Sequence, residues 1–236
     1  MRRLVLRSIV LGFCSVVPCI SAEPPSQTER REEQQRKVAE LTLELASQRL
    51  ALATNSQEKC AVVLSFLDNE IRSPSIARKS SSYFTWHEHA LMKYTEMLGS
   101  HGKGAGTFLK AESTKASGLK RKLLNIALAR SGDQEAIGKL PELLANEDAP
   151  VLKIMAMRAI PEGADAAALV PLLKEALKDT YRVQGDDSVG TFHVYPIREE
   201  AYRTLKRLGP SWSENRQAEK IENSHSPDAE EQDQSR

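Results

Sequence analysis

Cysteine is scarce in this chain of 236 residues, which contains only three. Cys14 and Cys19 lie in an apolar N-terminal segment, so Cys60 is the single cysteine outside it. One cysteine excludes an intramolecular disulfide from the rest of the chain. Cys60 falls on the apolar side of an expected helix, which favours a small buried hydrophobic side chain over a reactive thiol or an intermolecular disulfide.

The chain also lacks an excess of charge of either sign, with 33 Lys and Arg against 32 Asp and Glu. Residues 1–22 hold three of the basic residues and no acidic one, so the remainder has 30 basic against 32 acidic residues, a formal net charge of −2. Nucleic-acid binding relies on many Lys and Arg contacts to phosphates. The charge balance therefore argues against a nucleic-acid partner.

Recognisable catalytic motifs are missing as well. His87-Glu88-His89 lacks the H-E-x-x-H order of a zinc protease, and residues two apart on a helix point to nearly opposite sides. The segment 102–107 has the residue types of a phosphate-binding loop but not their order. Glu199 and Glu200 are interpreted as a solvated helix face. The sequence thus predicts no catalytic, cofactor or metal site, and a protein that is not an enzyme.

The first 22 residues have the layout of a secretory signal peptide. Arg2, Arg3 and Arg7 come before an apolar run from Ile9 to Ile20. After this run, Ser21-Ala22 precedes abruptly polar sequence. The run is shorter than the roughly 20 apolar residues that cross a bilayer, and Pro18 interrupts it. We expect cleavage near Ala22 and export to the periplasm or the extracellular space. Membrane association is expected only if the segment is retained.

Residues 23–98 are expected to form a small N-terminal helical unit. Residues 29–52 contain no Gly or Pro and predict one long helix. Its apolar residues fall at heptad spacing, with Gln48 at the remaining position of the seam: Val38, Leu41, Leu45 and Leu52. This pattern favours a helix packed on its neighbours, with a self-associating coil as the alternative. Two further helices are expected near 60–71 and 83–98, the second ending at Gly99.

Residues 99–118 are rich in Gly and Ser and predict a loop or frayed linker, with at most a turn of helix near Phe108. Apolar periodicity then returns and predicts helices near 119–128, 136–144, 151–160, 168–177 and 196–208. Asp133 and Asp165 are expected to cap the helices that follow them. The polar residues 210–236 predict a disordered tail.

The segment 119–209 matches itself at an offset of about 30 residues, which pairs Leu140-Pro141 with Val170-Pro171 and Leu143 with Leu173. With these repeats and the stretch from Ile197 to Gly209, it resembles HEAT repeats, of the short type seen in phycobilin lyase-like and many bacterial HEAT proteins. The resemblance implies an all-α fold, a short α-solenoid of helical hairpins that the N-terminal unit caps. It also implies a scaffold that presents a curved surface to a partner.

An insertion at 179–195 interrupts the last repeat. Its two short alternating runs, 180–183 and 191–195, flank a turn rich in Gly, Asp and Ser and predict a small β-hairpin. Loops that break a repeat array often carry its binding contacts. Five residues of types enriched in interface cores are therefore candidate partner-binding residues: Tyr181, Arg182, Phe192, His193 and Tyr195. The alternative is that the aromatic residues only pack the hairpin onto the helix ends.

The sequence as a whole predicts an exported, non-catalytic module for protein–protein interaction or scaffolding, with a protein partner that the sequence does not identify. Two alternatives stay open. One is an enzyme similar to the bilin lyases, which the signal peptide disfavours because that chemistry is intracellular. The other is a structural protein that self-associates through the helix at 29–52.

Overall fold

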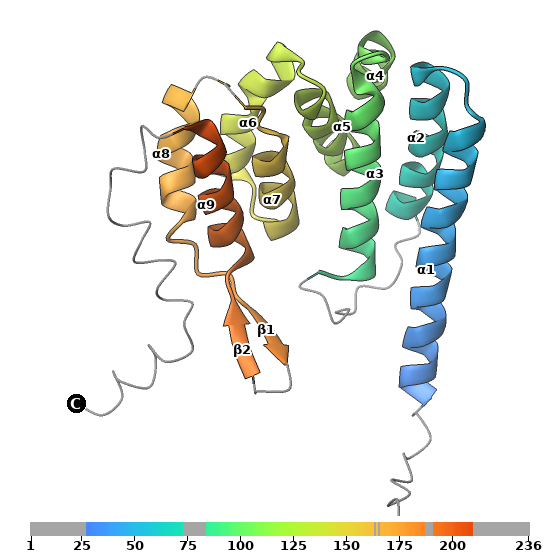
Figure 1. Ribbon diagram of the computed structural model, residues 1–236, viewed down its shortest axis with the longest axis horizontal. Helices are drawn as coiled ribbons and strands as arrows, with labels where there is room; N and C mark the ends of the chain where they lie inside the picture. The colour runs from blue at the N-terminus through green and yellow to red at the C-terminus, as the bar shows by residue number, and fades with distance from the viewer. Residues whose placement is uncertain (1–26, 73–83, 163, 165, 187–190, 210–236) are drawn as a thin grey trace, which may run out of the picture.

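The computed structural model describes residues 27–72, 84–162, 164, 166–186 and 191–209 (Figure 1). The expected signal peptide, the expected tail at 210–236 and Asp165 lie outside these residues. Most of the described residues are helical, and two short strands form the sheet that they contain. The prediction of a mostly helical protein is therefore confirmed. Across the described ranges, every helix is too short or too polar to cross a bilayer.

The helices and strands follow one another in the order α1 (Gln27–Leu52), α2 (Ser56–Arg72), α3 (Trp86–Gly102), α4 (Gly106–Lys115), α5 (Gly118–Arg130), α6 (Gln134–Asn146), α7 (Pro150–Ala159), α8 (Ala166–Ala176), β1 (Val183–Asp186), β2 (Thr191–Val194) and α9 (Pro196–Leu208). Helices α3, α5, α7 and α9 contact one another in that order. Helix α2 packs on α3, α4 on α5, and α6 on α5, α7 and α8. Helix α1 forms one edge of the molecule, and α8 and α9 form the other (Figure 1).

One continuous core joins the N-terminal helices to the rest of the chain. It extends from Ala46 in α1 to Leu205 in α9, and both residues are fully buried. Helix α5 lies at its centre, where Leu123 and Leu124 have no exposed surface. Residues 23–98 and 119–209 are therefore not separated by a linker.

The predicted linker at 99–118 is wrong. Helix α3 continues through Gly99 to Gly102, and α4 follows after a short turn, with Leu109 fully buried. Gly99 does not end the helix; it allows α5 to approach, because a Cβ atom there would lie 2.7 Å from Cδ of Arg130. The glycines that suggest a loop in the sequence instead serve close helix packing.

Helix α1 packs with the face opposite to the one that its sequence suggests. Ala39 and Ala46 are buried, and Leu43 and Leu50 pack beside them against the core. The heptad residues face away from α2 and α3, with exposed fractions of 63% for Val38, 62% for Leu41, 42% for Leu45 and 82% for Leu52. Packing of α1 on its neighbours is thus observed, but the apolar seam does not make it.

Local signals for helix starts agree with the structure where they lie within it. At the start of α3, the backbone N–H of Glu88 donates to Oγ1 of Thr85 at 3.1 Å, and the Glu88 carboxylate accepts from the Thr85 backbone N–H at 2.8 Å. Asp133 caps α6 as predicted, accepting from the backbone N–H of Ala136 at 3.1 Å. These caps fix where each helix begins.

The two prolines of the predicted repeat lie inside α6 and α8, and these helices contact each other. Burial does not follow the predicted pairing, however. Leu140 and Leu173 are buried, whereas Leu143 and Val170 are only half-buried. An offset of 33 residues, which pairs Leu140 with Leu173, matches the buried positions better than an offset of 30. The two offsets differ by nearly one helical turn and keep the same face.

Candidate functional site

Strands β1 and β2 form an antiparallel hairpin within the insertion, with Val183 opposite Val194 and Gln184 opposite His193. The first strand begins at Val183, three residues later than the predicted run. Val183 and Val194 are buried, whereas Gln184 and His193 are exposed. Because side chains alternate along a strand, one face of the hairpin packs inward and the other faces solvent.

The five candidate residues differ in their exposure. Arg182 and His193 are exposed, and Tyr181 is 37% exposed. Tyr195 is half-buried, with the guanidinium of Arg198 stacked 4.1 Å from its ring centroid. The side chain of Phe192 lies outside the described part of the structure, although its backbone pairs with Gly185. The hairpin offers Arg182, His193 and Tyr181 to solvent, while Tyr195 supports the start of α9.

Tyr181 lies at the base of the hairpin, two residues before β1. Partial burial raises the pKa of its hydroxyl, and the negative charge of Glu88 raises it further. Glu88 lies in the first turn of α3. Figure 1 shows the hairpin and the start of α3 at the same edge of the molecule.

A groove of about 680 Å³ runs between α3 and α9. Four helices supply its lining: α3 contributes Glu96, α5 contributes Arg130, α7 contributes Arg158, and α9 contributes the remaining residues, Glu200, Arg203, Lys206 and Arg207. Five of these seven side chains are basic and two are acidic. The groove is therefore positively charged, in a chain whose overall charge is close to neutral.

Arg158 holds both acidic residues of the groove. Its Nε atom lies 2.9 Å from Oε2 of Glu200, and one of its terminal nitrogens lies 3.8 Å from Oε1 of Glu96. The Glu200 side chain is only 7% exposed, so this ion pair is shielded from water on the α9 side. Arg158 thus ties α3, α7 and α9 together. It shares Glu200 with Arg203, at 3.9 Å, and Glu96 with Lys93, at 3.4 Å.

Of the four other cations, Arg203 pairs with Glu199 at 3.2 Å and lies 3.9 Å from Glu200. The remaining positive charge comes from Arg130, Lys206 and Arg207. In the described part of the chain, none of these three cations has a carboxylate at salt-bridge distance. Arg207 donates to the backbone carbonyl of Met157 and to Oγ1 of Thr204, both at 3.0 Å, which fixes its guanidinium beside the groove. The three side chains leave a positive surface that a negatively charged ligand can neutralise.

The position of Arg130 depends on the close approach of α3 and α5. A Cβ atom on Gly99 would lie 2.9 Å from both Cβ and Cγ of Arg130. The stem of the arginine therefore lies directly on the backbone of α3, and few other positions are open to it. Gly102 allows a similar approach of Ser131, the residue that follows Arg130.

The histidine and glycine motifs have structural roles. His87 pairs with Glu70 of α2 at 2.7 Å between Nδ1 and Oε1, and burial lowers the pKa of His89. The segment 102–107 contains the end of α3, the turn at 103–105 and the start of α4. Within the described residues, no three metal-ligating side chains come together.

Cys60 is fully buried, and this burial raises the pKa of its thiol to about 11. Its interpretation as a buried hydrophobic side chain is confirmed.

The sequence did not reveal the groove, because its lining comes from four helices spread over more than a hundred residues. Only one signal was local: Arg203, Lys206 and Arg207 share one face of the α9 sequence at spacings of three and four residues. The interpretation of Glu200 as part of a solvated face is wrong, because Arg158 covers it and it is buried.

No known protein family, no characterised protein and no solved structure shows a significant match to this chain.

Proposed function

We propose that this protein is a non-catalytic protein–protein interaction module that binds an acidic segment of a protein partner in the groove between α3 and α9. The observation that carries this proposal is the charge of the groove, where five cations face two carboxylates. Arg158 and Arg203 form ion pairs with carboxylates, and three further cations remain. Arginine is also among the residues enriched at protein interfaces, where its planar guanidinium binds carboxylates in a bidentate geometry.

The arrangement of the helices supports a scaffold of the HEAT type. In a short α-solenoid, one helix of each hairpin contributes to a continuous inner row. The ordered contacts of α3, α5, α7 and α9 are compatible with such a row, and α6 and α8 are compatible with an outer one. In this proposal the groove lies on the inner row, the surface that solenoid proteins generally present to a partner.

The hairpin extends the proposed binding surface at one end of the groove. The hairpin leads directly into α9 and lies at the same edge of the molecule as the start of α3 (Figure 1). Arg182 and His193 are exposed on the hairpin and add a guanidinium and an imidazole group. A partner chain that follows the groove would reach them after its acidic segment.

Export is part of this proposal. Residues 1–22 carry the charge and apolar pattern of a signal peptide, and the described helices include no alternative membrane-spanning segment. A mature protein that begins at Glu23 by N-terminal sequencing supports export, whereas a mature protein that retains Met1 in the cytoplasm contradicts it.

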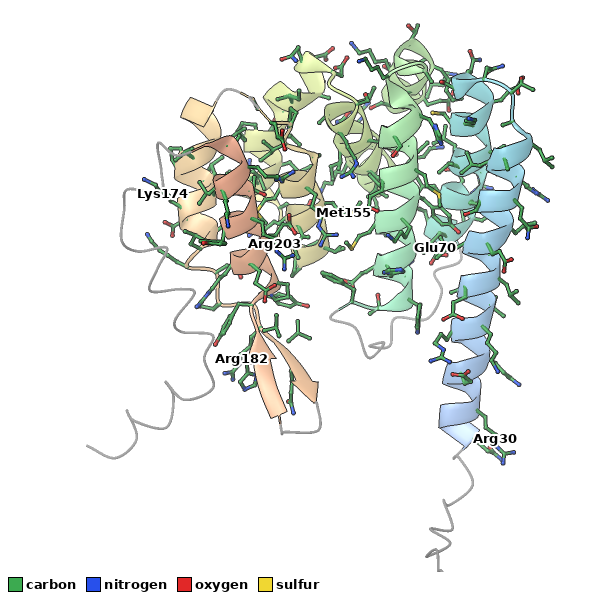
Figure 2. All side chains as sticks on the ribbon, in the orientation of Figure 1. Arg30, Glu70, Met155, Lys174, Arg182 and Arg203 are labelled. Atoms are coloured by element: carbon green, nitrogen blue, oxygen red, sulfur yellow. The ribbon has the colours of Figure 1, made fainter. Side chains whose placement is uncertain are left out.

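The binding proposal is tested with a fluorescein-labelled octaglutamate peptide and residues 23–236, which contain every described residue. We expect anisotropy to detect binding at low ionic strength and salt to weaken it, because exposed charges are screened. Arg203→Glu together with Lys206→Glu should weaken binding at least about tenfold, since it reverses two charges at the groove. The matched control, Lys174→Glu with Lys178→Glu, makes the same change of charge on and after α8. Figure 2 labels Lys174 and Arg203.

Two results would overturn the proposal. If the α8 control weakens binding as much as the groove variant, the peptide responds to net charge and not to the groove. If a single-stranded DNA 20-mer binds in the groove more tightly than the peptide, as judged by the same pair of variants, the ligand is nucleic acid and not an acidic protein segment.

A further inference from the structure

Helix α1 carries nearly all of the large apolar surface that the described residues expose. Five large apolar or aromatic side chains are exposed there, and four of them lie on α1: Val38, Leu41, Leu45 and Leu52. The fifth is Tyr181 in the hairpin. Isolated exposed apolar residues are common, but a contiguous set on one helix face marks an interaction surface.

These four residues form one stripe along the outer face of α1. They follow one another at steps of three, four and seven residues, and Gln48 occupies the one polar position of the seam. The buried Ala39 and Ala46 lie on the other side of the helix, against α2 and α3. A stripe with a period of 3.5 residues is the pattern that packs against a second helix of the same kind.

We propose that α1 pairs with α1 of a second copy of this chain, as a parallel, in-register coiled coil. In this register Val38, Leu41, Leu45 and Leu52 each meet the same residue of the other copy. Gln48 of one copy then faces Gln48 of the other. The two amides can therefore form hydrogen bonds with each other, and neither faces an apolar side chain. A single polar pair of this kind specifies register and orientation in coiled coils.

Charges beside the stripe agree with the same register. Glu44 precedes Leu45 and Arg49 follows Gln48, the positions that come together between parallel coiled-coil helices. Glu44 of one copy would therefore face Arg49 of the other, twice by symmetry. The Arg49 guanidinium already lies 5.6 Å from the ring centroid of Phe66 in its own chain, which holds it at the edge of the stripe.

Other registers pair these residues less well. A parallel shift of one heptad places Gln48 against Leu41 or misses it, and an antiparallel pair places Gln48 opposite an apolar residue such as Val38. Each alternative buries an amide without its partner, which is costly in an apolar seam. The in-register parallel pair is the arrangement that satisfies both the amide and the flanking charges.

The position of α1 leaves room for this pair. Helix α1 forms an outer edge of the molecule, with the other helices on its opposite side (Figure 1). A two-fold axis parallel to α1 therefore places the two bodies on opposite sides of the pair. The stripe is short compared with a standard interface of about 20–30 residues per partner. We therefore expect a dimer that dissociates on dilution.

Sedimentation velocity of residues 23–236 over a range of concentrations tests the pair. The wild type should shift from monomer to dimer as its concentration rises. Leu41→Glu with Leu45→Glu should remain monomeric, because both changes place charges in the seam. Ser47→Glu with Arg36→Gln is the matched control, since it makes the same change of charge at two exposed positions of α1 outside the stripe, and it should dimerise like the wild type.

A cysteine at position 48 tests the orientation. Gln48→Cys should form an intermolecular disulfide in mild oxidant, since equivalent seam positions face each other only in the parallel pair. Cys60, the other cysteine of this fragment, is buried and should not react. A wild type that stays monomeric at all concentrations, or a dimer that survives Leu41→Glu with Leu45→Glu, overturns the pair. A dimeric Gln48→Cys that does not crosslink overturns its parallel orientation.

The surface on α1 and the groove between α3 and α9 share no residue. Failure of the octaglutamate peptide to bind therefore leaves the dimer unaffected, and a monomeric protein leaves groove binding unaffected.

Discussion

Helices α5 and α1 distribute large and small apolar residues in opposite ways. Helix α5 buries Leu123, Leu124 and Ile126, all at most 2% exposed. Helix α1 buries Ala39 and Ala46 and exposes its leucines at the heptad positions. In both sequences the apolar residues are spread around the helix and not gathered on one face. Even so, α5 forms the centre of the core and α1 forms an edge.

The difference follows from the number of neighbours. Helix α5 contacts α3, α4, α6 and α7. These helices cover its surface except for a narrow exposed strip. Within the described residues, helix α1 makes its main contacts with α2 and α3. Small residues on its inner face let it lie close to these two helices. Its large residues then remain for a partner outside the chain.

The largest effect that this comparison predicts is at the centre of the core. Leu124→Ala should lower the free energy of unfolding by about 2–5 kcal/mol, because Leu124 is fully buried and its removal leaves a cavity. Leu41→Ala, which removes the same atoms from the exposed stripe, should change it by less than about 0.5 kcal/mol. Urea denaturation at a concentration where the protein is monomeric measures both. Equal losses would contradict the assignment of the two faces.

Sequence patterns located most of the helices but not the faces that they bury. The helix at 196–208 was predicted at its observed bounds, and the Asp133 cap was correct, because both depend on residues close together in the chain. The outward orientation of Leu41 and Leu45 was not predictable in the same way. Two faces of α1 carry apolar residues, and only the size of the neighbouring helices' side chains decides between them.

The helical structure of residues 99–118 was missed for a related reason. Gly99 and Gly102 raise the local preference for a loop, whereas their function is to admit Arg130 and Ser131 from another helix. A contact between residues about thirty positions apart leaves no local trace. The groove has the same origin, since Glu96, Arg130 and Arg158 come together only when α3, α5 and α7 pack side by side.

An intermediate effect is expected on the inner face of α1. Ala46→Leu should lower the free energy of unfolding by about 1–3 kcal/mol, because Ala46 is fully buried and the larger side chain overpacks the contact with the core. The adjacent change Leu45→Ala should be nearly neutral in the monomer, although it shortens the apolar stripe. Thermal unfolding of the two variants at low concentration separates them. A stabilising Ala46→Leu would mean that α1 has space on its inner face.

The smallest expected effect compares two glycines inside helices. Gly99→Ala gains about 1 kcal/mol of helix propensity, but its new Cβ would lie 2.7 Å from Cδ of Arg130, and the resulting overpacking costs about 1–3 kcal/mol. We therefore expect a net loss of up to about 2 kcal/mol. Gly138→Ala, in the exposed part of α6 with no atom within 4 Å of its Cβ position, should instead stabilise the protein by about 0.5–1 kcal/mol.

The two glycine variants also separate stability from binding. The methyl group at position 99 displaces the stem of Arg130, which lines the groove, so Gly99→Ala should weaken binding of the octaglutamate peptide. Gly138→Ala changes no residue of the groove and should bind like the wild type. If Gly99→Ala is destabilised but binds the peptide normally, the close approach of α3 and α5 supports the core alone, and Arg130 does not contribute to the site.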